Sequence, residues 1–303
     1  MCGITPHIGR SAGKVNIGFY RGIKMSTFKL CAFADEADQL VSGQIKALQE
    51  NNIELLEVRG VNGKSVTDLT TVEMRELRKE LDDGGIKVWS IGSPIGKIGM
   101  RDDFGAHLEL FRHTLELAHI AGADKMRIFS FHMNDEDPVK CKDEVIDRMG
   151  KFVDVAKGSG ISLCHENEKG IYGDVPERCV DILKAIPEIS AVYDPANFIQ
   201  CGAETLSAWK LLKPYIHYMH MKDALADKTV VPPGKGDANI PVLLEEYASI
   251  GGGVITLEPH LSAFVGLSDL EIEGKGMQSI IGNGYKTRRD AFDAGVNALK
   301  ALI

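Results

Sequence analysis

The stretch "YIHYMHMKDA" (residues 215–224) places two histidines, a lysine and an aspartate in a segment that is otherwise typical of a buried strand. Because side chains alternate between the two faces of a strand, His220 and Lys222 share one face and His217 lies on the other. Unpaired ionisable groups are costly to bury, so this segment needs a reason to carry them. We expect His220 and Lys222 to face a functional site and His217 to be a satisfied packing residue.

Ionisable residues also follow other apolar runs of the chain. Glu166, Asp194 and Glu258 stand at such positions and, with His220, offer three carboxylates and one imidazole. Such a hard, oxygen-rich set predicts one divalent metal ion, with Mn²⁺ favoured and Mg²⁺, Co²⁺ or Zn²⁺ compatible. Open positions on that ion would let two neighbouring sugar oxygens chelate it. The ion would then act as a Lewis acid on an enediolate.

Eight apolar runs alternate with amphipathic segments whose apolar residues recur at three- and four-residue spacing. Eight β–α units over about 250 residues predict a (β/α)₈ TIM barrel, in which the carboxyl ends of the strands form the active face. An open doubly wound sheet is the alternative, but no G-x-G-x-x-G turn follows the first run. The predicted strands are residues 28–33, 54–60, 87–93, 125–132, 161–167, 190–195, 216–223 and 253–259.

The predicted domain organisation is one barrel over residues 28–303, preceded by an extension over residues 1–27. The first 24 residues contain four basic residues and no acidic one. We expect a poorly ordered extension or an upstream start ahead of Met25. The last predicted β–α connection, from Pro259 to about Lys286, is long enough to be a lid or binding loop.

Bulk composition excludes several classes of function. The chain of 303 residues has a net charge of −8, and the basic leader leaves −12 on the remainder, so no nucleic-acid partner is expected. No apolar run is long enough to span a bilayer, so no membrane role is expected. The six cysteines form no C-x-x-C pair, which favours a reducing cytoplasm. A small molecule is the expected partner, and homo-oligomerisation is compatible with these features.

Nearly the whole chain from about Phe28 to Ile303 resembles the sugar phosphate isomerase/epimerase family of xylose isomerase-like TIM barrels, within the AP endonuclease family 2 superfamily. That superfamily also includes the ketose 3-epimerases, inosose dehydratase and endonuclease IV. The matching segments are "ELLEVRGVNGKSV", "SIGSPIGKI", "RIFSFH", "ENEKGIYGD", "DPANFIQCG", "HMKDA", "VPPGKGD" and "LEPHL".

The resemblance implies that Glu166 of "HENE", Asp194 of "YDPAN", His220 of "HMKD" and Glu258 of "LEPH" bind one divalent metal. It also implies catalytic roles for the two glutamates, because in the epimerase members one takes a proton from one face of the substrate carbon and the other returns it on the opposite face. Glu168 is the alternative to Glu166.

The sequence departs from the ketose 3-epimerases at Asn197, where they carry a histidine, and at Lys222. These departures leave the identity of the sugar open, including whether it is phosphorylated. The residues expected to contact substrate are Arg59, His132, Asn197, Lys222, Lys235 and His260.

Several of these residues have alternative roles. Arg59 and Arg127 are candidates for holding a carboxylate or phosphate, although Arg127 could instead face the helices in an ion pair. Lys235, between two glycines, is expected either to cradle an anion or to lie in a plain turn. His132 and His260 are expected to donate to substrate hydroxyls or to orient a ligand glutamate.

The predicted function is a metal-dependent sugar or sugar phosphate isomerase or epimerase, working by proton abstraction beside a carbonyl through a metal-stabilised enediolate. The same site would also serve a lyase, a dehydratase or an eliminase acting on an oxidised sugar or glycoside. A non-catalytic sugar-binding barrel is the third possibility. An endonuclease is disfavoured, because that branch needs more metal-binding histidines and a basic groove.

Overall fold

The structure, a computed structural model, describes residues 28–134, 136–262 and 284–303. The expected N-terminal extension and most of the long connection after Pro259 lie outside the described residues. The predictions of an extension and of a lid or binding loop therefore stay predictions.

Eight parallel strands close into a barrel in the order β1-β12-β9-β8-β7-β6-β5-β2. This confirms the (β/α)₈ fold and rules out the open sheet. Each strand falls within one of the eight predicted runs. The strands are β1 Lys29–Ala32, β2 Leu55–Val58, β5 Lys87–Ile91, β6 Lys125–Ile128, β7 Ser162–Glu166, β8 Ser190–Tyr193, β9 Ile216–Met221 and β12 Val254–Leu257.

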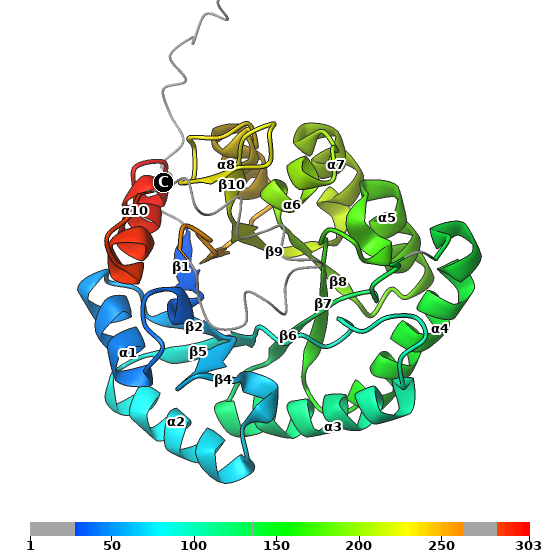
Figure 1. Cartoon of the computed structure of the whole chain (residues 1–303), viewed down its shortest axis with the longest axis horizontal. Coiled ribbons are helices and arrows are strands. Elements are labelled where there is room, and N and C mark those ends of the chain that lie inside the picture. The colour runs from blue at the N-terminus through cyan, green and yellow to red at the C-terminus, as the bar shows by residue number, and fades with distance from the viewer. Residues whose placement is uncertain (1–27, 135, 263–283) are drawn as a thin grey trace, which may run out of the picture.

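Helices surround the barrel on its outer side (Figure 1). Their amphipathic pattern explains this position: in α2, Met74, Leu77 and Leu81 are buried at three- and four-residue spacing. The Thr70–Glu73 capping box satisfies backbone groups at the start of that helix. The helices are α1 Val41–Glu50, α2 Thr71–Asp83, α3 Phe104–Ala121, α4 Pro138–Ala156, α5 Pro176–Ala185, α6 Pro195–Gln200, α7 Thr205–Leu212, α8 Ile240–Ser249 and α10 Arg288–Lys300.

Short strands and 3₁₀ turns lie in the segments that connect the barrel strands and the helices. Two hairpins pair β3 with β4 and β10 with β11. Their bounds, with those of the 3₁₀ turns, are β3 Gly60–Val61, β4 Lys64–Ser65, β10 Asp223–Ala224, β11 Val230–Val231, η1 Ala34–Glu36, η2 Val66–Asp68, η3 Tyr172–Asp174 and η4 Lys213–Tyr215.

The two faces of β9 show how the barrel separates polar from apolar side chains. Met219 and Met221 belong to the main hydrophobic core, which the helices share. Tyr218 and His220 are equally buried but hydrogen-bond across the barrel interior to Glu57. The predicted alternation along this strand is thus observed, and its polar face lies inside the barrel.

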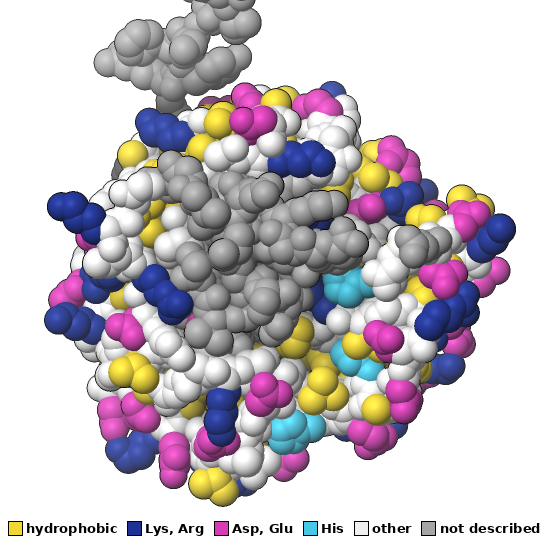
Figure 2. Space-filling view, in the orientation of Figure 1, with side chains coloured by type: hydrophobic (Ala, Val, Ile, Leu, Met, Phe, Trp, Pro, Cys, Tyr) yellow, Lys and Arg dark blue, Asp and Glu magenta, His cyan; other side chains and the backbone are white. Residues whose placement is uncertain are grey.

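The surface agrees with the charge argument from the sequence. In Figure 2, acidic and basic side chains of the described residues are interspersed around the visible face. Of the helices that the structure describes, none has both the length and the apolar character needed to cross a bilayer.

Candidate metal centre

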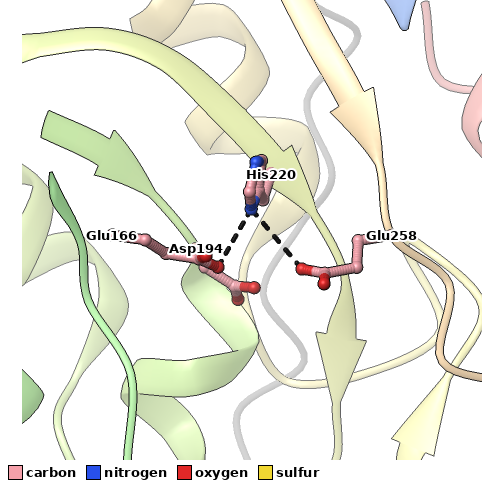
Figure 3. A group of neighbouring side chains, drawn as sticks. All are labelled: Glu166, Asp194, His220 and Glu258. Atoms are coloured by element: carbon pink, nitrogen blue, oxygen red, sulfur yellow. Dashed lines mark hydrogen bonds and ion pairs between the residues drawn. The ribbon is translucent and has the colours of Figure 1, made fainter. Parts of the chain in front are cut away.

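Four adjacent strands of the barrel, β7, β8, β9 and β12, each carry one residue of the predicted ligand set at or just after their carboxyl ends. Glu166 is the last residue of β7, Asp194 follows β8, His220 lies near the end of β9, and Glu258 follows β12. Each offers a ligand atom within 4.8 Å of the other three, and all four residues are buried. Figure 3 shows the four side chains converging on one point.

His220 is at the centre of the cluster. Its Nδ1 lies 2.9 Å from Oε1 of Glu166 and 3.4 Å from Oε2 of Glu258, which reach it from opposite sides (Figure 3). Asp194 is the N-cap of α6, and its Oδ1 accepts the backbone N–H of Asn197 at 2.9 Å. That bond turns Oδ2 of Asp194 toward the interior.

The carboxylate oxygens of this cluster are under-satisfied. Oε2 of Glu166, Oδ2 of Asp194 and Oε2 of Glu258 are buried and accept no hydrogen bond from the part of the chain that the structure describes. Cationic groups form ion pairs with them: Arg127 Nη1 is 3.2 Å from Oε2 of Glu166, and Lys222 Nζ is 3.0 Å from Oδ2 of Asp194. Buried polar atoms are normally paired. Three buried carboxylate oxygens that accept no hydrogen bond from the described chain, beside one imidazole, fit the donor set of a divalent metal ion.

The surrounding charges control the protonation of the cluster. Burial opposes a charge on His220, but the carboxylates of Glu166 and Glu57 outweigh it and hold the His220 pKa well above its usual range. Burial raises the pKa of Asp194 to about 7 against the opposing charge of Lys222. For Glu258 burial acts in the same direction, but Lys222 and His260 overcome it and keep its pKa well below normal. The positive charge of Lys222 thus favours the ionised forms of both Asp194 and Glu258.

Lys222 and Arg127 supply positive charge at the edge of the cluster. Lys222 Nζ lies 3.0 Å from Oδ2 of Asp194 and 3.6 Å from Oε2 of Glu258. Arg127 points into the barrel and contacts Glu166, with its Nη2 donating to the carbonyl of Gly92 at 2.9 Å. It therefore does not form an ion pair on the helix side, which was one of its two expected positions.

Arg59 and His260 lie on the Glu258 side of the cluster. Arg59 Nη1 is 2.8 Å from Oε1 of Glu258, and its other nitrogens bind the carboxylates of Asp35 and Glu36. His260 Nε2 is 3.1 Å from the same Glu258 oxygen. Both residues thus hold Glu258 in place, and the Arg59 guanidinium already faces three carboxylates.

Glu168, the alternative to Glu166, lies apart from the four-residue cluster. Its Oε2 pairs with Lys97 Nζ at 3.2 Å, and both side chains are buried. His132 comes after β6, and its backbone bridges Gly99 and Ile171. Nδ1 of His132 is buried and has no hydrogen-bond partner in the described chain.

The remaining predicted residues differ in how near they lie. Asn197 is within the site, because its Nδ2 is 3.4 Å from Oε1 of Glu166. Lys235 is exposed in the loop after β11, and the amide N–H groups of Gly234 and Gly236 on either side of it donate to the Asp223 carboxylate. His217 is exposed at the start of β9, so its prediction as a packing residue is wrong.

Glu57 is the important residue that the sequence reasoning missed. It is fully buried in β2, and its Oε2 is 3.1 Å from Nε2 of His220. A signal was present: Glu57 alternates with Arg59, so it shares the inward face of that strand. Asp35 and Glu36, just after β1, were missed in the same way.

Comparisons with known proteins agree with this architecture. Residues 45–280 match the family described as xylose isomerase-like TIM barrel. The chain is similar to the crystal structure of the probable 3-DHS dehydratase AsbF from Bacillus anthracis, at 16% identity and a TM-score of 0.67, covering 90% of this chain and 98% of that one. Curated proteins give no match.

Two further solved structures have the same TM-score of 0.67. One is the IOLI protein with a zinc atom, at 16% identity, and the other is D-psicose 3-epimerase with D-tagatose from Clostridium cellulolyticum H10, at 15% identity. Each match covers 91% of this chain and 98% of the other. At these identities the likeness shows the fold alone.

Proposed function

The chain belongs to the xylose isomerase-like TIM barrels, and from that premise we propose that it is a divalent-metal-dependent isomerase or epimerase of a carbohydrate. The observation that carries the proposal is the cluster of Glu166, Asp194, His220 and Glu258, with its three buried oxygens that accept no hydrogen bond from the described chain. The sugar epimerase among the similar structures supports the substrate class.

The donor set suits an ion such as Mn²⁺, Mg²⁺, Co²⁺ or Zn²⁺, and one similar structure holds zinc. When bound, the ion would supply Lewis-acid polarisation of a sugar carbonyl, which acidifies the neighbouring C–H bond. Glu166, Asp194, His220 and Glu258 would hold it.

The two glutamates are the proposed proton carriers. They approach the centre from opposite sides, as inversion of a planar carbon requires (Figure 3). Oε1 of Glu258 is fixed by Arg59, and Oε1 of Glu166 faces His220. Each carboxylate has two oxygens, so in each residue one could bind the ion while the other takes or returns the proton.

The test is solvent deuterium incorporation. Protein purified without chelator is incubated in deuterated water with a panel of ketoses, 3-oxo sugars and sugar phosphates. For a substrate found this way, Glu166→Gln and Glu258→Gln should each slow C–H exchange by about 10²–10⁴-fold, the usual cost of a missing general base. Metal content is measured alongside, so that loss of the base is separated from loss of the ion.

Glu168→Gln is the matched control. It makes the same chemical change two residues from Glu166, on a side chain that pairs with Lys97 instead of joining the cluster. It should keep one metal per chain and should exchange faster than Glu166→Gln. Exchange at the parent rate in both the Glu166 and Glu258 variants, with metal still bound, would refute the proton-transfer role.

The second candidate is elimination from the same deprotonated substrate, which would make the protein a lyase or dehydratase. Lys222 favours it, because its ammonium lies buried beside Asp194 and Glu258, where it could donate a proton to a departing hydroxyl. The hydroxyl and that proton leave as water, so a product lighter by one water, detected by mass spectrometry, would distinguish elimination from isomerisation.

A further inference from the structure

Glu57 is a fully buried carboxylate next to the four-ligand cluster, and it lies inside a dense hydrogen-bond network. Its Oε1 accepts the Tyr218 hydroxyl at 2.8 Å, and its Oε2 accepts the Thr256 hydroxyl at 2.8 Å. The same Oε2 is 3.1 Å from Nε2 of His220. All four side chains are 0% exposed. Burying a carboxylate is costly unless it is paired, and the three neighbouring hydrogen-bonding groups offset that cost for Glu57.

The imidazole of His220 lies between Glu57 and the carboxylates of the cluster. Nε2 faces Glu57, while Nδ1 faces Glu166 and Glu258. Phe33 packs edge-on against the ring at 5.1 Å between centroids, and Tyr218 packs at 5.4 Å. These contacts restrict the ring, so the two nitrogens keep separate partners.

A metal ion binds the neutral imidazole, which carries a single N–H and has a lone pair on its other nitrogen. We propose that Glu57 is a positioning residue, which holds the proton of His220 on Nε2 and so presents the Nδ1 lone pair to a divalent cation shared with Glu166, Asp194 and Glu258. The inference rests on the proposed metal centre and adds a residue outside the ligand set.

A carboxylate is the group that this position needs. Tyr218 and Thr256 both direct hydroxyl donors at Glu57, and His220 adds a third donor. An ionised carboxylate accepts all three, because it offers only acceptors. An amide in its place would direct its own N–H groups at one of these donors. Carboxylates that orient metal-binding histidines in this way typically contribute 10- to 100-fold to metal affinity.

The test uses Mn²⁺ alone as the probe of affinity. Glu57→Gln should weaken Mn²⁺ binding by about 10- to 100-fold in a chelator competition. A second readout is nitrogen-15 NMR of the imidazole in metal-free protein, at a pH where the ring is neutral, because an ion on Nδ1 would itself force the proton onto Nε2. In the parent the His220 proton should be on Nε2 alone, and in Glu57→Gln that preference should be lost. A merely structural role would leave the tautomer unchanged.

Tyr218→Phe is the matched control. It removes a hydrogen bond from Oε1 of the same carboxylate and leaves the contact between Oε2 and His220 in place. Its Mn²⁺ affinity should fall by less than that of Glu57→Gln, because the Oε2 contact with His220 is kept. Glu57→Asp is the second variant: it keeps the charge but draws the oxygens back from Nε2, so it should also weaken Mn²⁺ binding. It provides the test if Glu57→Gln does not fold.

Two outcomes would overturn the inference, and they differ in what else they affect. Mn²⁺ affinity at the parent level in both Glu57 variants, with the proton still on Nε2, would remove the positioning role and leave the metal centre intact. A parent protein that binds no Mn²⁺, Mg²⁺, Co²⁺ or Zn²⁺ at about 1 mM, the weak limit for a specific site, would remove the proposed function as well.

Discussion

At the scale of single residues, His107 shows how a buried ionisable group can couple stability to pH. It is 7% exposed, and its Nε2 accepts the backbone N–H of Gly96 at 2.8 Å. That bond needs a neutral ring with Nε2 unprotonated. Burial lowers the pKa of His107 to about 4, against the weaker opposing effect of Asp102. The folded protein therefore resists protonation at this position.

This residue should make the fold less stable as the pH falls. Between its unfolded pKa of about 6.5 and its folded pKa of about 4, the unfolded chain binds the proton and the folded chain does not. The stabilisation is complete above about pH 6.5 and is lost as the pH falls toward 4. We expect about 1–2 kcal/mol of loss from this group between about pH 7.5 and pH 5.

The measurement is urea denaturation of the parent and of His107→Gln at both pH values. The difference between the two proteins isolates the contribution of His107 to the free energy of unfolding. The amide oxygen of Gln can still accept the Gly96 N–H, so the variant should fold and should lose less stability than the parent on acidification. An identical pH dependence in the two proteins would show that other groups are responsible.

At the scale of elements, the loop after β11 is organised by one side chain at the end of the barrel. Oδ2 of Asp223 accepts the N–H groups of Gly234 and Gly236 at 2.8 and 2.9 Å, and its Oδ1 accepts that of Ala238 at 3.2 Å. The sequence indicated that this glycine-flanked segment could cradle an anion. The amide groups there already bind an anion, the carboxylate of Asp223 itself.

Removal of that carboxylate should open the loop. Each hydrogen bond to a charged group contributes about 1.5–3 kcal/mol. Asp223→Ala should therefore raise trypsin cleavage after Lys235 by at least about tenfold, the ratio that corresponds to 1.4 kcal/mol. Asp227→Ala is the control, because Asp227 is exposed and accepts the N–H of Thr229, two residues away. Equal cleavage of the Asp223 variant and the parent would contradict this account of the loop.

The scale of the whole molecule explains which features the sequence could predict. The strands were predictable because each is a short apolar run, and the convergence of Glu166, Asp194, His220 and Glu258 was predictable because each lies at or just after the end of such a run. Their pairing was not, because partners come together only when the barrel closes. Glu57 and His220 are 163 residues apart, and Arg59 and Glu258 are 199 apart. No local sequence pattern indicates such contacts, so the sequence predicted only that Glu57 lies in a buried strand.

That closure also determines how a metal should affect stability. The four proposed ligands come from neighbouring strands, β7, β8, β9 and β12, but spread over residues 166–258 of the chain. The unfolded chain does not bring them together, so an ion should bind the folded state preferentially and stabilise the whole barrel. At 100 times the dissociation constant the gain is about 2.7 kcal/mol.

For a domain of this size, such a gain should raise the unfolding midpoint by about 5 °C. The measurement is thermal unfolding of chelator-treated protein with and without added Mn²⁺, followed by reversal with EDTA. Asp194→Asn is the diagnostic variant, because it removes a charged ligand. Its side-chain oxygen can still accept the Asn197 N–H and cap α6, so the fold should be retained. The shift should shrink markedly in that variant. If parent and Asp194→Asn respond alike, the stabilising ion binds elsewhere, because no other change separates the two proteins at this site.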